Sequence, residues 1–376
     1  MKNIKYIIIL AFFLINLAFL MDFPSIHSDE LWLKGIAEQM LKEKTFNTTE
    51  PFFDLYPRTI HPFRWLYNAV IILALTLVSP NVISVRLISL VFGTLTIWVI
   101  SGWLERIVKS KWLTVAGLCL LTLDIQFVYA SHMGRQETFI LFLLVLGLSL
   151  VQKYAKSIRT SKLTGWLSCI TLLGMGVHPN SFILGVTFSG ILIYLWINQQ
   201  LSIKIFVRYI AYTIIGTLGY VFFGLILNSN FLNEYFKYGA ALGVDAPLTN
   251  RFEGFYWYFY KLFHQIGGTY DLFDIRMQLS LMVIIVFSQA ILWLKFKRVN
   301  ILFPTFIGIG LSLFLIGRYN QLAVVFFSPF IVLSVMEMLS VFNHKKRVQI
   351  GLVIILLSLW SLNLISNLTH YDQQRF

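Results

Sequence analysis

The sequence predicts an all-helical polytopic membrane protein with about eleven transmembrane helices and further helices on the external membrane surface. Of its 376 residues, 57% are hydrophobic and only 12% are charged, and the mean hydropathy is +0.74. Soluble globular domains do not reach such values. Eleven apolar runs reach or approach the roughly 17 residues that a bilayer-spanning helix needs. Lys and Arg, in addition, collect in alternate loops, which is typical of membrane proteins.

The apolar runs divide the chain into spans and loops. The first run follows Lys2 and Lys5 and ends near Met21, and no small-residue cleavage site comes after it. We therefore interpret it as a span and not as a removable signal peptide. The eleven runs begin near these residues: Tyr6, Val82, Trp112, Thr138, Leu163, Ser181, Ile205, Leu279, Ile301, Leu322 and Val348.

A further run, Trp65 to Val78, has about 14 residues and suits either a short span or a helix lying at the interface. If it crosses the membrane, every later basic loop faces outward, against the positive-inside rule. If it does not cross, the N-terminus and all the basic loops are cytoplasmic. We therefore predict a juxtamembrane helix here, a cytoplasmic N-terminus and an external C-terminus. The cytoplasmic basic residues are then Lys2, Lys5, Arg106, Lys109, Lys111, Lys153, Lys156, Arg159, Lys162, Lys204, Arg208, Lys295, Lys297, Arg298, Lys345, Lys346 and Arg347.

This topology also accounts for the net charge of +13. In a soluble protein that charge would suggest a nucleic-acid partner, but here it marks cytoplasmic loops and we expect none. The chain divides into a membrane module at 1–230, which contains a first external loop at 22–81, an external loop at 231–278, and C-terminal transmembrane helices at 279–376. Cys119 and Cys169 lie inside apolar runs, so neither a disulfide framework nor a C-x-x-C site is expected.

The first external loop opens with His27, Ser28, Asp29 and Glu30, directly before a predicted helix at 31–44 whose apolar positions recur with a helical period. Ser28 or Asp29 would cap this helix, and carboxylates there would also face the helix dipole favourably. The chemical alternative is that two adjacent carboxylates beside a histidine form a general base or a metal site.

Cationic side chains lie close to the external surface in the same module. His61 and Arg64 precede the juxtamembrane helix, where they would either anchor it or bind an anionic phosphate. Arg135 and Glu137 occupy the external turn at 131–137, either as a simple ion pair at a helix end or as part of a site.

Two further arginines stand where a cation is disfavoured. Arg86 lies inside the second span, and Arg318 lies on the external turn at 317–320 between two apolar runs. Arg318 should be compensated by an anion, and Arg86 is costly inside the span unless it is paired or snorkels to the surface, which makes both candidates for binding a phosphate. The 231–278 loop combines Tyr and Trp with carboxylates, a composition that suits sugar binding or an interfacial aromatic belt.

Three of these motifs resemble the GT-C superfamily of membrane glycosyltransferases, in particular the branch of protein O-mannosyltransferases and lipid A aminoarabinose transferases. His27-Ser28-Asp29-Glu30-Leu31-Trp32 is similar to the first-loop Asp-Glu motif of that branch. The segment from Asn81 to Gly93, with Arg86-Leu87, is similar to its second-span signature. Arg135-Gln136-Glu137 is similar to its second-loop Arg-Pro-acid element, with Gln136 in place of the proline.

The resemblance covers roughly residues 1–200 and implies a function. It implies inverting transfer of a sugar from a polyprenyl-phosphate carrier to a glycan, lipid or protein hydroxyl at the outer face of a bacterial or archaeal plasma membrane. Asp29 would then be the catalytic base, with Glu30 beside it. The side chains expected at the donor phosphate or sugar are Arg135, Glu137, Arg86, Arg318, Arg64 and His61. Where the branch has Lys-Pro-Pro before the surface helix, this chain has His61-Pro62-Phe63.

No cofactor is required by this scheme, although His27, Glu30, His61 and His132 could converge on a Zn or Mn ion. The rival class is a multi-pass transporter of a small anionic or sugar-like solute. Transporters place ionisable residues at the bilayer midplane and show repeat symmetry. Here the polar residues sit at span ends on one face. A scaffolding protein would leave these clusters unexplained.

Overall fold

The structure is a computed structural model and describes residues 3–50, 60, 62–154, 160–241, 245–268, 270–297, 299–316 and 321–374. Within these residues the chain forms helices and no strand. The helices that build the site are α2 (Ser28–Glu43), η2 (Pro62–Arg64), α3 (Trp65–Leu77), α4 (Val82–Val108), α6 (Ile125–His132) and α7 (Glu137–Tyr154). The others are α1 (Ile4–Ala18), α5 (Lys111–Thr122), α8 (Thr160–Val177), η3 (Pro179–Ser181), α9 (Phe182–Ile197), α10 (Ile203–Leu227), α11 (Phe231–Ala241), α12 (Leu248–His264), α13 (Arg276–Phe296), α14 (Leu302–Ile316), η4 (Gln321–Phe326), α15 (Ser328–Ser340), η5 (Val341–His344) and α16 (Lys346–Gln374).

The multi-pass membrane prediction is confirmed. Among the described residues, seven helices are long and apolar enough to cross a bilayer, and α5 with α6 makes an eighth span if this pair, bent by 59°, crosses as one. The shorter apolar helices α1, α8 and α14 coincide with the remaining predicted runs. The count of eleven spans stays a prediction, and so does the interfacial position of α3.

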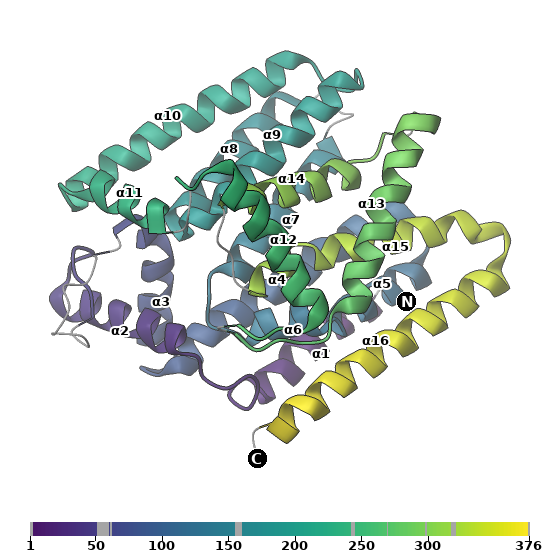
Figure 1. The fold of residues 1–376 in the computed structure, drawn as a ribbon, viewed down its shortest axis with the longest axis horizontal. Coiled ribbons are helices and arrows are strands. Elements are labelled where there is room, and N and C mark those ends of the chain that lie inside the picture. The colour runs from purple at the N-terminus through teal and green to yellow at the C-terminus, as the bar shows by residue number, and fades with distance from the viewer. Residues whose placement is uncertain are drawn as a thin grey trace.

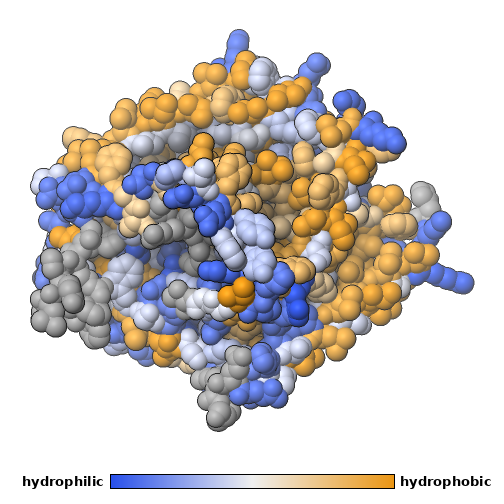
Figure 2. Space-filling view, in the orientation of Figure 1, coloured by the Kyte–Doolittle hydropathy of each residue, from blue (hydrophilic) through white to orange (hydrophobic). Residues whose placement is uncertain are grey.

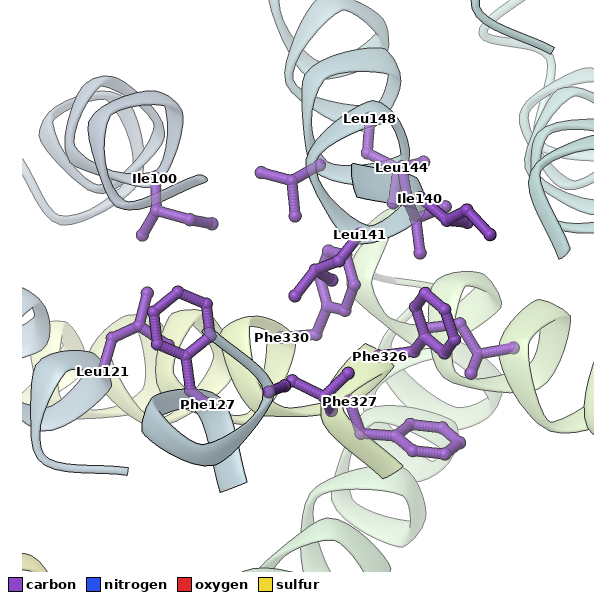
Figure 3. Packing of buried hydrophobic residues seen from close by; sticks show 14 of the residues in the cluster. Ile100, Leu121, Phe127, Ile140, Leu141, Leu144, Leu148, Phe326, Phe327 and Phe330 are labelled. Atoms are coloured by element: carbon purple, nitrogen blue, oxygen red, sulfur yellow. The ribbon is translucent and has the colours of Figure 1, made fainter. Parts of the chain in front are cut away.

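The apolar core lies where α4, α5, α7 and α15 meet. Phe330 of α15, Leu121 of α5 and Leu144 of α7 are completely buried there, and Figure 3 shows these side chains pointing toward one another. The apolar window of α15 is 89% buried, so this helix is surrounded by protein. It packs against α4, α5, α13, α14 and α16.

The outer helices bury far less of their surface. The apolar windows of α10, α13 and α16 are 11%, 17% and 17% buried, respectively. Large apolar side chains remain exposed along them, and Figure 2 shows this hydrophobic surface over α10 and α13. Because exposed apolar surface of this extent is disfavoured in water, these helices are the ones that face lipid.

One close helix contact depends on a glycine. A Cβ at Gly308 of α14 would lie 2.8 Å from the Cα of Thr187 in α9, so a larger residue would push the two helices apart.

The helices near the candidate site lie together: α2, α3 and α11 gather on the left side of the molecule in Figure 1, and α12 lies across the bundle. This group of helices carries the candidate site.

Candidate functional site

The site is built around the N-terminus of α2. His27 is the N-cap residue: its Nδ1 accepts a hydrogen bond from the Asp29 amide at 3.1 Å, and the Glu30 carboxylate accepts one from the His27 amide at 2.9 Å. This reciprocal pair is a capping box with histidine in the capping position. The predicted helix is thus present, but the prediction that Ser28 or Asp29 caps it is wrong. Because His27 caps the helix, the Asp29 side chain is available for other contacts.

Glu30 and Arg86 form a completely buried ion pair between α2 and α4. The guanidinium donates through Nε and Nη2 to the two carboxylate oxygens, at 2.8 Å each, and both side chains have no exposed surface. Arg86 also donates to the carbonyls of Leu20, Pro24 and Ser25. All five of its N–H groups therefore have protein acceptors. Of the two possibilities for Arg86, pairing and snorkelling, the structure shows pairing, with Glu30, and this geometry favours a structural role for both residues.

Asp29 lies at the water-facing edge of the site, with 34% of its side chain exposed. Its Oδ2 accepts hydrogen bonds from Arg135 Nη1 and from the Tyr270 hydroxyl. Within the described part of the chain no donor reaches Oδ1. One carboxylate oxygen is thus held in place while the other can accept a proton.

Arg135 connects the two carboxylates of the predicted motifs. It contacts Asp29 and lies 3.2 Å from Glu137, which is 4% exposed, and it stacks over the Tyr270 ring at 4.9 Å. Burial lowers the pKa of Arg135, but the Glu137 carboxylate and the other neighbours raise it more, and the net shift is upward. Arg135 therefore remains cationic beside Asp29.

Tyr270 completes this group from the loop before α13. Burial raises the pKa of Tyr270 to about 12, so its phenol stays protonated and donates to Asp29. Its ring also stacks on His27 at 4.4 Å. Sequence reasoning did not single out Tyr270, and the only signal was the aromatic content of the 231–278 loop.

Arg64 presents the opposite case to Arg86. Its side chain is buried, with 3% exposure, and its guanidinium stacks against Trp32 of α2 at 4.7 Å and Tyr238 of α11 at 5.5 Å. Its Nε is buried with no hydrogen-bond partner, and no carboxylate among the described residues forms an ion pair with it. Within the described residues, this buried cation is thus stacked on aromatic faces and lacks the anion that such a group requires.

The remaining predicted residues are distributed differently. His132 is buried behind the site, where its ring nitrogens contact the Phe23 carbonyl at 2.6 Å and the Asn16 side chain at 2.7 Å. Among the described residues no group of three or more His, Cys, Asp or Glu side chains is arranged to hold a metal. His61 and Arg318 lie outside the described residues.

The C-terminal end of α16 holds two loops that lead to the site. Tyr371 contacts Ser25 through its hydroxyl, at 2.8 Å from Ser25 Oγ. The amide of Asn363 donates to the Asp274 carbonyl at 2.8 Å, and Asn367 accepts from the Asp274 amide at 2.6 Å. Ser25 precedes α2, and Asp274 follows Tyr270 in the chain. The end of α16 thus helps to position both Asp29 and Tyr270.

An apolar groove opens on the lipid-facing side, between α8 and α10. It has a volume of about 530 Å³ and is lined by residues that include Gly165, Gly219, Trp65 and Tyr220. The Tyr220 hydroxyl donates to the carbonyl of Phe63 at 2.7 Å. One end of the groove therefore adjoins η2, the segment that ends with Arg64.

Two solved structures share this arrangement of helices. The crystal structure of ArnT from Cupriavidus metallidurans bound to undecaprenyl phosphate has a TM-score of 0.58 and 13% identity, with 94% of this chain and 64% of ArnT covered. The same protein in the apo state gives 0.52 and 12%, with 93% and 62% covered. This chain thus spans a little under two thirds of the length of ArnT. No family model matches the chain, and no curated protein matches at a significant level.

ArnT is a lipid A aminoarabinose transferase with the GT-C fold. The present chain therefore has the fold of the GT-C membrane glycosyltransferases. The resemblance found in the sequence motifs is confirmed at the level of the fold.

Proposed function

We propose that this protein transfers a sugar from a polyprenyl-phosphate donor to an acceptor hydroxyl on the non-cytoplasmic face of the membrane, with inversion at the anomeric carbon. The observation that carries this proposal is that two groups lie together at α2: a partly exposed carboxylate, Asp29, and a buried cation, Arg64, which stacks on Trp32 one turn further along and forms no ion pair with a described carboxylate. Such a site supplies a proton acceptor and a phosphate-binding group together. The GT-C fold supports the same assignment.

Asp29 acts as the base in this scheme. Its Oδ1 takes the proton from the acceptor hydroxyl, whose oxygen attacks the anomeric carbon while the bond between that carbon and the phosphate oxygen breaks. The products are the glycosylated acceptor and a polyprenyl phosphate. Arg135 and Tyr270 hold Oδ2 and fix the orientation of the carboxylate, and Glu137 in turn orients Arg135.

Arg64 binds the phosphate that leaves with the lipid. Hydrogen bonds between charged partners are worth about 1.5 to 3 kcal/mol each, and the buried guanidinium is stabilised when an anion arrives. Trp32 and Tyr238 hold it in a fixed position by their ring faces. Arg318 remains a second candidate for the phosphate.

The groove between α8 and α10 accommodates the start of the polyprenyl chain. It is apolar, faces lipid and adjoins the segment that ends with Arg64. A Cβ added at Gly219 would meet no atom within 4 Å, so a leucine there would occupy the groove without displacing protein atoms. Gly351 of α16 is equally open and lies elsewhere, so Gly351→Leu is a matched control.

Thermal unfolding of the detergent-purified protein tests the proposal. Undecaprenyl phosphate should raise the unfolding temperature, Gly219→Leu should reduce this effect, and Gly351→Leu should not. Free sugars and nucleotide sugars should have no effect. Stabilisation by the water-soluble ligands alone would overturn the assignment in favour of a transporter.

The external position of the site is tested by labelling with a reagent that cannot cross membranes. In a variant without the native cysteines, a cysteine at Asn250, an exposed residue near the start of α12, should react in intact cells. A cysteine at Lys345, exposed between α15 and α16, should react only after lysis. The reverse pattern would place the site in the cytoplasm.

A further inference from the structure

Three polar side chains lie on one buried face where η2 continues into α3. Arg64, Tyr67 and Asn68 are spaced i, i+3 and i+4, so they lie within one turn of each other on the same side of the helix. Their exposed fractions are 3%, 0% and 1%, respectively. We call these three residues the α3 polar stripe.

The α3 polar stripe contains buried polar atoms that the described part of the chain leaves unpaired. Arg64 Nε, the Tyr67 hydroxyl and both amide atoms of Asn68 are without a hydrogen bond to any described residue. Buried polar groups are nearly always paired, because leaving one unpaired costs much of its solvation. Four such atoms within one helical turn therefore indicate a missing ligand.

The start of α7 adds two more groups of the same kind. Gln136 Oε1 and Thr138 Oγ1 are buried without a partner in the described chain, and both residues flank Glu137. The Tyr67 phenol lies within electrostatic range of Glu137, Arg64 and Glu30. Tyr67 and Gln136 are thus both near the carboxylates of the proposed site, since Gln136 Nε2 also lies 3.4 Å from a carboxylate oxygen of Glu137.

We propose that Tyr67 and Asn68 of the α3 polar stripe, with Gln136, form the subsite that recognises the hydroxyl groups of the donor sugar, beside the phosphate that Arg64 binds, an inference that rests on the proposed function. The unpaired atoms include donors, on the Tyr67 hydroxyl and the Asn68 amide nitrogen, and acceptors, on Asn68 Oδ1 and Gln136 Oε1. A sugar hydroxyl both donates and accepts, so a polyol satisfies both kinds. A phosphate only accepts and would leave the two carbonyl oxygens unpaired.

The subsite is closed in this structure, so the donor must open it. Trp32 of α2 and Tyr238 of α11 cover Arg64 from two sides. Movement of α11 away from α2 would expose the stripe, beginning with Arg64. Return of α11 over the bound sugar would then exclude water from the anomeric carbon.

The test compares undecaprenyl phosphate alone with undecaprenyl phosphate carrying glucose, mannose or aminoarabinose, on the full-length protein in detergent. Wild-type protein should bind one sugar-bearing lipid more tightly than the bare lipid. Asn68→Leu and Tyr67→Phe should each weaken that complex by about 10-fold or more and leave binding of the bare lipid unchanged. Tyr67→Phe removes a single oxygen, so it keeps the test usable if Asn68→Leu does not fold. Thr76→Val, on the opposite, exposed side of α3, is the matched control.

The outcomes separate the two claims. If every sugar-bearing lipid binds no better than the bare lipid, or if the variants weaken both ligands equally, the stripe holds only water or is structural and the inference is overturned. If wild-type protein binds none of the lipids, it is the proposed function that fails. An unfolding temperature of ligand-free Asn68→Leu at or above the wild-type value would support the inference, because a purely structural amide would cost stability when lost.

Discussion

Two buried arginines in this molecule have opposite surroundings. Arg86 is fully enclosed and every donor group is matched by the Glu30 carboxylate or a backbone carbonyl. Arg64 is enclosed to nearly the same extent, yet among the described residues its guanidinium stacks on the rings of Trp32 and Tyr238 and forms no ion pair. An arginine whose N–H groups all have protein acceptors stabilises the fold, whereas one with an unpaired N–H group can still donate a hydrogen bond to a ligand. The hydrogen-bond partners of a buried arginine, and not its burial alone, therefore distinguish Arg86, to which we assign a structural role, from Arg64, which we propose to bind a ligand.

The largest effect on thermal stability should come from breaking the buried ion pair of Glu30 and Arg86. Glu30→Gln removes one charge of a completely buried ion pair, and the cost of leaving the other charge buried is about 3 to 5 kcal/mol. We expect this variant to unfold at a much lower temperature or to fail to accumulate. Replacing both partners, as Glu30→Leu with Arg86→Met, should be less harmful than either single change. A folded Glu30→Gln variant with unchanged thermal stability would contradict the structural role.

The next largest effect is expected on turnover, from a change at Asp29, the carboxylate that we propose as the base. Asp29→Asn keeps the size of the side chain but loses the proton acceptor, so we expect turnover to fall by about 10² or more with little change in the unfolding temperature. The measurement is sugar transfer by purified protein in detergent, with the unfolding temperature as control. Near-normal transfer by folded Asp29→Asn would refute the assignment of the base.

A smaller effect is expected at the end of α16. Tyr371→Phe removes the hydroxyl that contacts Ser25 and leaves the ring, which packs on Phe23, in place. A hydrogen bond of this kind is worth about 0.5 to 1.5 kcal/mol. Because the contact positions the segment before α2, we expect kcat to fall while KM for the lipid donor stays the same. An increase in KM alone would indicate that this residue acts on donor binding instead.

The sequence predicted the helix after Asp29 and the succession of apolar helices of a multi-pass membrane protein, because helical period and span length are local properties. It could not predict which partner each charge takes. The buried pair of Glu30 and Arg86 joins residues 56 positions apart, and the contact between Asp29 and Tyr270 joins residues 241 positions apart. Such pairings depend on how helices pack, which no local pattern encodes.

The same limit explains the ranking of the arginines. From sequence, Arg86 ranked above Arg64 as a candidate for the phosphate, because Arg86 lies in a segment that resembles the second-span signature. In the structure the Arg86 guanidinium donates five hydrogen bonds to protein acceptors, so all of its N–H groups are paired. The Nε of Arg64, in contrast, has no partner among the described residues. Arg64 consequently becomes the principal candidate, and Arg86 a residue that holds the first external loop in place.

The most direct test of this account is the affinity of undecaprenyl phosphate for Arg64→Gln. We expect binding to weaken by roughly 10-fold to 150-fold, the equivalent of about 1.5 to 3 kcal/mol, with the unfolding temperature of the ligand-free protein close to that of wild type. Arg276→Gln, which removes an exposed arginine paired with Asp274, is the control for net charge and should bind the lipid normally. Unchanged lipid binding by folded Arg64→Gln would contradict the central claim that Arg64 holds the donor phosphate.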